Sequence, residues 1–106
     1  MTPPTTILFN VGGTKYEVSK SLLEMFPDTM LAALASPRWY PEANDEEALK
    51  PIFIDRNGER FQYVLDYMRD DGTVYLPNDI PPDAIIAELE YFGQNTWVVM
   101  LYDIQP

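Results

Sequence analysis

The chain contains no cysteine and no histidine, and these two absences limit both its fold and its chemistry. Without cysteine there is no disulfide, no thiolate metal site and no thiol nucleophile. Without histidine the commonest general base and the commonest nitrogen ligand for zinc are missing. Such a chain must fold around an apolar core without disulfides or a thiolate metal site. Its 106 residues, 46% of them hydrophobic, suffice for one core and predict a single domain. Without cysteine and histidine, only carboxylates, lysines and tyrosines remain for catalysis, and we expect no enzymatic activity.

Acidic residues outnumber basic residues by 17 to 7, and the excess lies beyond the first 40 residues. Residues 41–71 carry nine acids and four bases, and residues 72–106 carry five acids and no base. A chain without a basic patch is expected to bind neither nucleic acid nor an anionic membrane surface directly. Residues 1–6 lack the basic and apolar stretches of a signal peptide, so we expect a cytoplasmic protein or domain.

A β-hairpin is predicted near the N-terminus. Residues 7–11 and 14–18 read as two strands, because apolar residues alternate with polar ones in the second, and Gly12-Gly13 supplies the turn between them. The segment Gly12-Gly13-Thr14-Lys15 does not fit a phosphate-binding loop, since a threonine separates the glycines from the lysine and a strand follows.

Two short helices are expected after the hairpin. Ser19 or Ser21 can cap the first helix, and Pro27 ends it, because the residue before a proline is disfavoured in a helix. Asp28 is predicted to cap the second helix, over residues 29–35.

A strand and an amphipathic helix occupy the middle of the chain. After a connection over residues 36–51, residues 52–55 are predicted to form a short buried strand. The Asn57-Gly58 turn leads into a helix that runs to about Asp70. Its apolar residues recur at helical spacing, namely Phe61, Val64, Leu65 and Met68.

The C-terminal third predicts one more extended segment and one more helix. Residues 73–76 are extended, and a helix from Pro81 or Pro82 to Phe92 follows, while the conformation of residues 97–104 is left open. The order of elements indicates an α+β fold, a small mixed sheet capped by helices.

Four segments in this order resemble the BTB/POZ fold in its potassium-channel tetramerisation branch. They are Phe9-Asn-Val-Gly-Gly-Thr14, Phe26-Pro-Asp-Thr-Met-Leu31, Phe53-Ile-Asp-Arg56 and Val64-Leu-Asp-Tyr-Met-Arg69. The resemblance covers roughly residues 7–93 and implies a domain over residues 7–95, with tails at 1–6 and 96–106. It implies that the family's signature turn is formed by Asn10, Gly12, Gly13 and Thr14, and that the structural positions are Pro27, Asp28, Phe61, Leu65 and Tyr67.

Self-assembly into tetramers or pentamers is the function that the resemblance implies. Subunit contacts in this branch are largely polar. The candidate interface residues are therefore Asp55, Arg56, Glu59 and Arg60 around the turn, with Lys15 and Glu17 on the second strand. From the residues alone, the four charges around the turn can equally well pair within one chain.

Cofactors and partners follow from the same resemblance. Several channel subfamilies hold zinc between subunits with histidine and cysteine, and this chain has neither, so we expect no cofactor and no equivalent metal site. Two settings remain open, a soluble adaptor for a cullin-type ubiquitin ligase and the cytoplasmic assembly domain of a voltage-gated potassium channel. An alternative of another class is a monomeric acidic domain that binds a basic protein partner.

Overall fold

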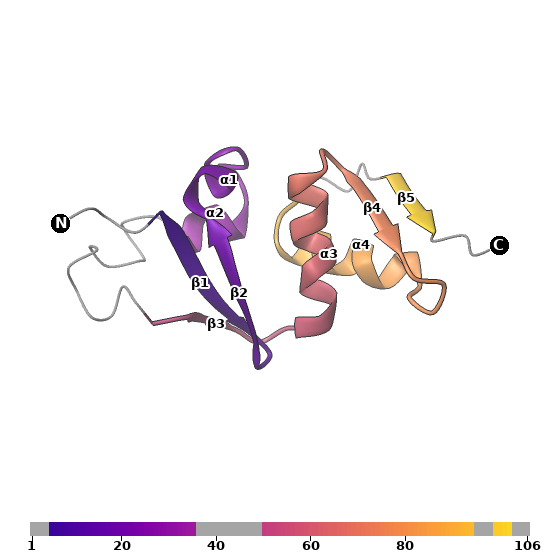
Figure 1. Cartoon of the computed structure of the whole chain (residues 1–106), viewed down its shortest axis with the longest axis horizontal. Coiled ribbons are helices and arrows are strands. Elements are labelled where there is room, and N and C mark those ends of the chain that lie inside the picture. The colour runs from indigo at the N-terminus through magenta and orange to yellow at the C-terminus, as the bar shows by residue number, and fades with distance from the viewer. Residues whose placement is uncertain (1–4, 36–49, 95–98, 103–106) are drawn as a thin grey trace. The chain divides into compact units, whose positions relative to one another are not determined.

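A computed structural model describes residues 5–35, 50–94 and 99–102 of the chain (Figure 1). The chain divides into two compact units, residues 1–58 and 59–106, and each is described by itself. The first contains β1 (Thr6–Val11), β2 (Thr14–Ser19), α1 (Lys20–Glu24), α2 (Met30–Ala35) and β3 (Ile52–Ile54). The second contains α3 (Gly58–Arg69), β4 (Thr73–Leu76), α4 (Pro82–Tyr91) and β5 (Val99–Tyr102), with α3 starting at the last residue of the first unit.

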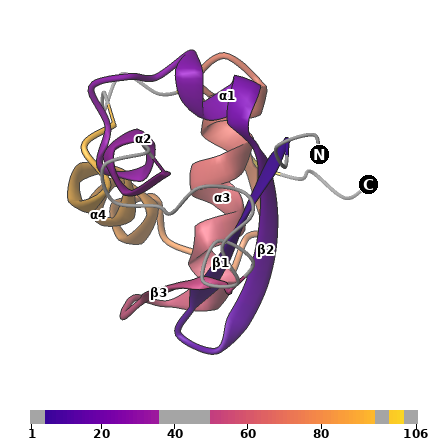
Figure 2. The same ribbon diagram turned by 90° about the vertical axis from the view of Figure 1, so that its left-hand side faces the viewer.

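A three-stranded mixed sheet organises the first unit. Strand β1 lies in the middle, antiparallel to β2 and parallel to β3. The hairpin predicted from the sequence is confirmed, and Figure 2 shows β2 running directly into α1. One face of the sheet contributes buried side chains to the core, namely Ile7, Phe9, Val11, Val18 and Ile54. The mixed sheet and the helices confirm the predicted α+β class.

Side-chain caps determine where the two short helices begin. Ser19 caps α1, because its hydroxyl accepts a hydrogen bond from the backbone N–H of Leu22 at 3.1 Å. The prediction that Asp28 caps the second helix is wrong. Helix α2 begins at Met30, so Thr29 occupies the capping position, and its hydroxyl accepts from the backbone N–H of Ala32 at 3.3 Å.

The glycine turn between β1 and β2 packs against the turn that follows β3. The backbone N–H of Gly12 donates to the carbonyl of Ile54 at 2.9 Å, and the hydroxyl of Tyr16 donates to the carbonyl of Gly58. Gly12 has a φ of 56°, and a Cβ there would overlap the carbonyl oxygen of Arg56. Glycine is therefore required at this turn for both its conformation and its lack of a side chain.

Helix α3 forms most of the core of the second unit, together with α4. The predicted apolar stripe is confirmed, since Phe61, Val64, Leu65 and Met68 are all buried. Tyr63 and Tyr67 are also buried, so α3 is covered over a wider face than the stripe indicates. The rings of Phe61 and Phe92 meet edge to face with centroids 5.1 Å apart, which joins α3 to α4.

Glycines end both helices of the second unit. Gly72 has a φ of 90° and donates its N–H to the carbonyl of Tyr67 at 2.8 Å, and Gly93 has a φ of 77° after α4. Strand β4, which follows α3 in the chain, pairs in parallel with β5, which follows α4, and the pairing begins with Thr73 opposite Val99. The tail whose conformation the sequence left open thus contains a strand over residues 99–102.

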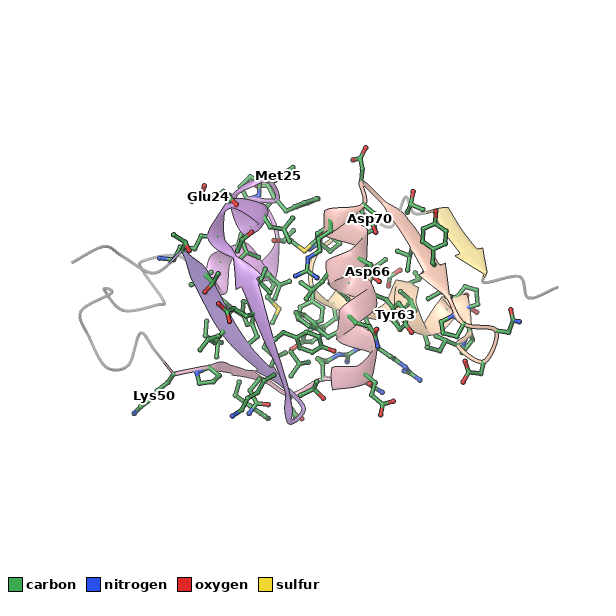
Figure 3. The ribbon with its side chains drawn as sticks, viewed as in Figure 1. Glu24, Met25, Lys50, Tyr63, Asp66 and Asp70 are labelled. Atoms are coloured by element: carbon green, nitrogen blue, oxygen red, sulfur yellow. The ribbon has the colours of Figure 1, made fainter. Side chains whose placement is uncertain are left out.

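A cluster of carboxylates lies along the exposed side of α3. Figure 3 labels Asp66 on this helix and Asp70 just after its last residue, together with the buried Tyr63. Burial raises the pKa of Asp66 above its usual value of 3.8, and the charge of Asp70 raises it further, while Arg69 opposes the shift.

Replacing Gly58 with alanine should destabilise the fold. A Cβ at Gly58 would overlap the carbonyl oxygen of Val11 and lie 2.7 Å from the Cβ of Thr14. We expect Gly58→Ala to lower the free energy of unfolding by about 1–3 kcal/mol in chemical denaturation, as overpacking does elsewhere. Gly13→Ala is the comparison, because a Cβ there meets no atom within 4 Å and the variant has backbone strain alone. Equal stability of Gly58→Ala and the wild type would contradict the contact.

Replacing Asp66 with asparagine should stabilise the protein at neutral pH. A raised pKa means that the folded state holds the proton more firmly than the unfolded state, so stability falls as pH rises from 3.8 through the folded pKa. Asp66→Asn should therefore melt at a higher temperature than the wild type at pH 7, and the difference should vanish at pH values below 3.8. Asp28→Asn, at an exposed position before α2, is the control. A gain that persists at low pH would contradict this explanation.

Candidate functional site

One face of the three-stranded sheet is directed away from the buried core and carries two of the predicted interface residues. The register pairs Leu8 with Glu17, and Asn10 with both Lys15 and Phe53. Because residues opposite one another in a sheet share a face, these five side chains lie together, and we call them the outer sheet face. Lys15, Glu17 and Phe53 are exposed, whereas Leu8 and Asn10 are half-buried.

A shallow hollow of about 230 Å³ lies at this part of the first unit. It is lined by Leu8, Phe9, Lys15, Tyr16, Glu17 and Pro51. The hollow combines apolar surface from Leu8 and Pro51 with one positive and one negative side chain. It therefore offers a partner apolar contact and a pair of opposite charges close together.

The carboxylate of Glu17 is held in place from the neighbouring strand. The hydroxyl of Thr6 donates a hydrogen bond to Oε2 of Glu17 at 2.6 Å, across the antiparallel pair. A carboxylate fixed in this way loses less side-chain entropy when a partner binds it. Glu17 is thus prepared to accept a hydrogen bond from a cationic side chain.

The remaining predicted interface residues surround the turn between β3 and α3. Asp55 and Glu59 are exposed, and Arg56 and Arg60 are half-buried. The turn is closed by a hydrogen bond from the backbone N–H of Arg56 to the carbonyl of Ile54 at 3.0 Å. It presents two acidic and two basic side chains within six residues of sequence.

The glycine turn brings Lys15 of the first set and Asp55 and Arg56 of the second to the same end of the first unit. Gly12 lies against the backbone of Arg56, and Gly13 donates its N–H to Oδ1 of Asn10 at 2.9 Å. Lys15 follows two residues after this turn, and Asp55 precedes Arg56. The glycine turn thus connects the hairpin to the turn after β3, and charged residues lie next to it.

The other residues that the resemblance singled out lie either in an exposed connection or in a buried part of a helix. Pro27 and Asp28 are exposed in the connection between α1 and α2. Phe61, Leu65 and Tyr67 are buried on α3. Only the three residues on α3 are part of a core, and none of the five is a member of the outer sheet face.

Phe53 is the member of this site that the sequence reasoning missed. Residues 52–55 were expected to form a buried strand, yet the side chain of Phe53 is 63% exposed and Asp55 is exposed as well. The prediction is correct for Ile54 and wrong for these two residues. Strand alternation is the signal that could have found them, because Ile54 faces the core and its two neighbours must point elsewhere.

The described residues show no sign of a metal site or a membrane span. Among the residues that the structure describes, no group of three or more aspartate or glutamate side chains could hold a metal ion. In the same part of the chain, none of the helices combines the length and the apolar character needed to cross a membrane.

Comparison with known proteins gives matches over most of the chain. The profile of the BTB/POZ domain family matches residues 7–101. The voltage-gated potassium channel KCNC3 of Homo sapiens is 33% identical over 87 residues, which are 82% of this chain and 11% of the channel. The KCNC3 channel of Rattus norvegicus is also 33% identical over 87 residues, 82% of this chain and 10% of the channel.

The chain therefore spans about a tenth of the length of these curated relatives. The family match extends from β1 into β5 and includes both sets of charged residues. The fold agrees with it, since the described residues form a small mixed sheet and helices, as expected from the sequence for a BTB/POZ fold. The chain belongs to the BTB/POZ domain family, in its potassium-channel tetramerisation branch, a family of protein-interaction and assembly domains.

Proposed function

We propose that this chain is a self-assembly domain, which joins copies of itself and thereby gathers the segments attached to it. The observation that supports this most directly is the family match over residues 7–101. The surface chemistry agrees, because opposite charges lie together on the outer sheet face and again around the β3–α3 turn. Each set is close to neutral, within a chain of net charge −10.

The proposed contact joins the two sets across a subunit boundary. Lys15 of one copy pairs with Asp55 or Glu59 of the next, and Glu17 pairs with an arginine of the same turn. A contact between two different surfaces can repeat around an axis and close into a ring, as a tetramer or a pentamer requires. Complementary charges at such a contact set the register and the choice of partner more than the affinity.

The setting that the comparisons favour is a channel. Both relatives are named as voltage-gated potassium channels, and the assembly domain of such a channel would carry membrane segments outside this sequence. An adaptor for a cullin-type ligase would be joined to a different partner domain, and the described surface has no feature that favours it. In either setting the chain would assemble without zinc bound by histidine or cysteine, since it has neither residue.

Charge reversal tests the proposed contact. Light scattering coupled to size exclusion should give about four or five times the mass of 12.2 kDa for the wild type. Lys15→Glu and Asp55→Lys should each weaken assembly about tenfold, because each places like charges opposite one another. The double variant should recover assembly, since it restores opposite charges.

Matched controls separate local contact from net charge. Arg69→Glu changes the charge of the chain as Lys15→Glu does, and Glu24→Lys changes it as Asp55→Lys does, both at exposed positions that belong to neither set. A wild type that stays monomeric at every concentration would overturn self-assembly and leave the monomeric acidic domain as the better hypothesis.

Salt should strengthen assembly between low and moderate concentrations. A tetramer would carry a charge of about −40, and salt screens this long-range repulsion more than it screens short contacts. The assembled fraction, measured by light scattering at fixed protein concentration, should rise as salt is raised from about 10 mM to about 150 mM. A steady decrease over that range would show that exposed ion pairs dominate the association.

A further inference from the structure

Among the described residues of the first unit, the most exposed aromatic side chain is that of Phe53, which lies on the outer sheet face at the edge strand β3. Phe53 is 63% exposed, while Ile54 beside it is 3% exposed. An aromatic ring left in water forgoes a large part of the burial energy that it can supply. The exposure of this ring, in a strand that was expected to be buried, therefore requires an explanation.

Strand pairing supplies the first step. Strand β3 pairs in parallel with β1, in a mixed sheet whose third strand is antiparallel. In sheets made of parallel strands, the strands are normally covered on both faces and apolar throughout. The sequence of β3, Ile-Phe-Ile, is of that kind. The core covers the side of the sheet that carries Ile54, whereas the side that carries Phe53 is open to solvent. The strand thus has the composition of one that a second layer covers.

The surroundings of Phe53 extend this apolar surface. Asn10 lies directly opposite in the register, and Leu8 is two residues along the same strand on the same face. Leu8 and Pro51 also line the shallow hollow beside Lys15 and Glu17. An aromatic residue within a mixed apolar and polar surface is typical of the central residues of protein interfaces.

The charge of the chain indicates which partner this surface takes. Residues 59–106 carry nine acids and two bases, so two copies that met through the second unit would repel each other strongly. The outer sheet face carries one base and one acid, Lys15 and Glu17. It is therefore the surface at which a second copy of this acidic chain can approach with little repulsion.

We propose that Phe53 is the apolar anchor of the contact between two copies of this chain, buried by the neighbouring subunit on the outer sheet face. The inference rests on the proposed self-assembly and adds to it a residue that the charge pattern alone does not identify. The ion pairs around Lys15 and Asp55 then set the register, and burial of Phe53 supplies most of the affinity.

The test compares Phe53 with Tyr75, an aromatic residue of almost equal exposure on β4. Tyr75 is 61% exposed and lies in the acidic second unit. Threonine suits both positions, because it keeps a high strand propensity. Phe53→Thr should raise the concentration needed for half-assembly about thirtyfold or more, as expected for a central aromatic. Tyr75→Thr should change it less than about threefold, as expected for a residue outside the contact.

A second measurement keeps the proposal testable if Phe53→Thr folds poorly. The chain has no cysteine, so Phe53→Cys and Tyr75→Cys each introduce a single thiol. The thiol at position 53 should react with a small thiol reagent far more slowly at assembling concentrations than at high dilution. The thiol at position 75 should react at the same rate in both conditions.

The outcomes separate this inference from the proposed function. A wild type that assembles while Phe53→Thr assembles equally well, or while the thiol at position 53 stays fully reactive, overturns the role of Phe53 and leaves self-assembly intact. Equal weakening by Phe53→Thr and Tyr75→Thr overturns it as well. A monomeric wild type overturns both.

Discussion

The contact between the glycine turn and the β3–α3 turn is the constraint on which the first unit depends. Strand β3 enters the sheet more than thirty residues after the hairpin ends, so it has no local signal for its register. The hydrogen bond from Gly12 to Ile54, together with the close approach of Gly12 to the backbone of Arg56, fixes that register. Any side chain at Gly12 or Gly58 would push these segments apart, and the charged residues on either side would lose their common position.

Local patterns predicted most of the elements of this fold. The hairpin, the serine cap of α1 and the apolar stripe of α3 depend on residues within one turn or one pair of strands, and all are confirmed. The cap of α2 was placed one residue early, because Asp28 and Thr29 are both good capping residues and only the first helical residue decides between them. The pairing of β4 with β5 was not predicted, since it joins segments more than twenty residues apart.

The charged residues of the candidate site were selected from the sequence, whereas its exposed apolar residue was not. Lys15, Glu17 and the residues of the β3–α3 turn can be selected from the sequence because charge is visible there. Phe53 cannot be selected in this way, since an apolar residue in a short apolar strand reads as core. Its exposure depends on which face the core of one chain covers, and its proposed burial depends on a second chain. From the sequence alone, an apolar residue buried within one chain cannot be told from one that a second chain would bury.

The composition of the chain limits how such an assembly can be held. Cysteine and histidine are absent, so a zinc ion bound by these residues cannot stabilise the subunit contact. Exposed ion pairs contribute at most about 1 kcal/mol each, which is little against the repulsion between copies of net charge −10. Apolar burial is a further source of affinity beside polar contacts, and it acts without regard to net charge. A large exposed aromatic on the near-neutral sheet face meets that requirement, whereas the exposed aromatics Tyr75 and Tyr91 lie in the strongly acidic unit.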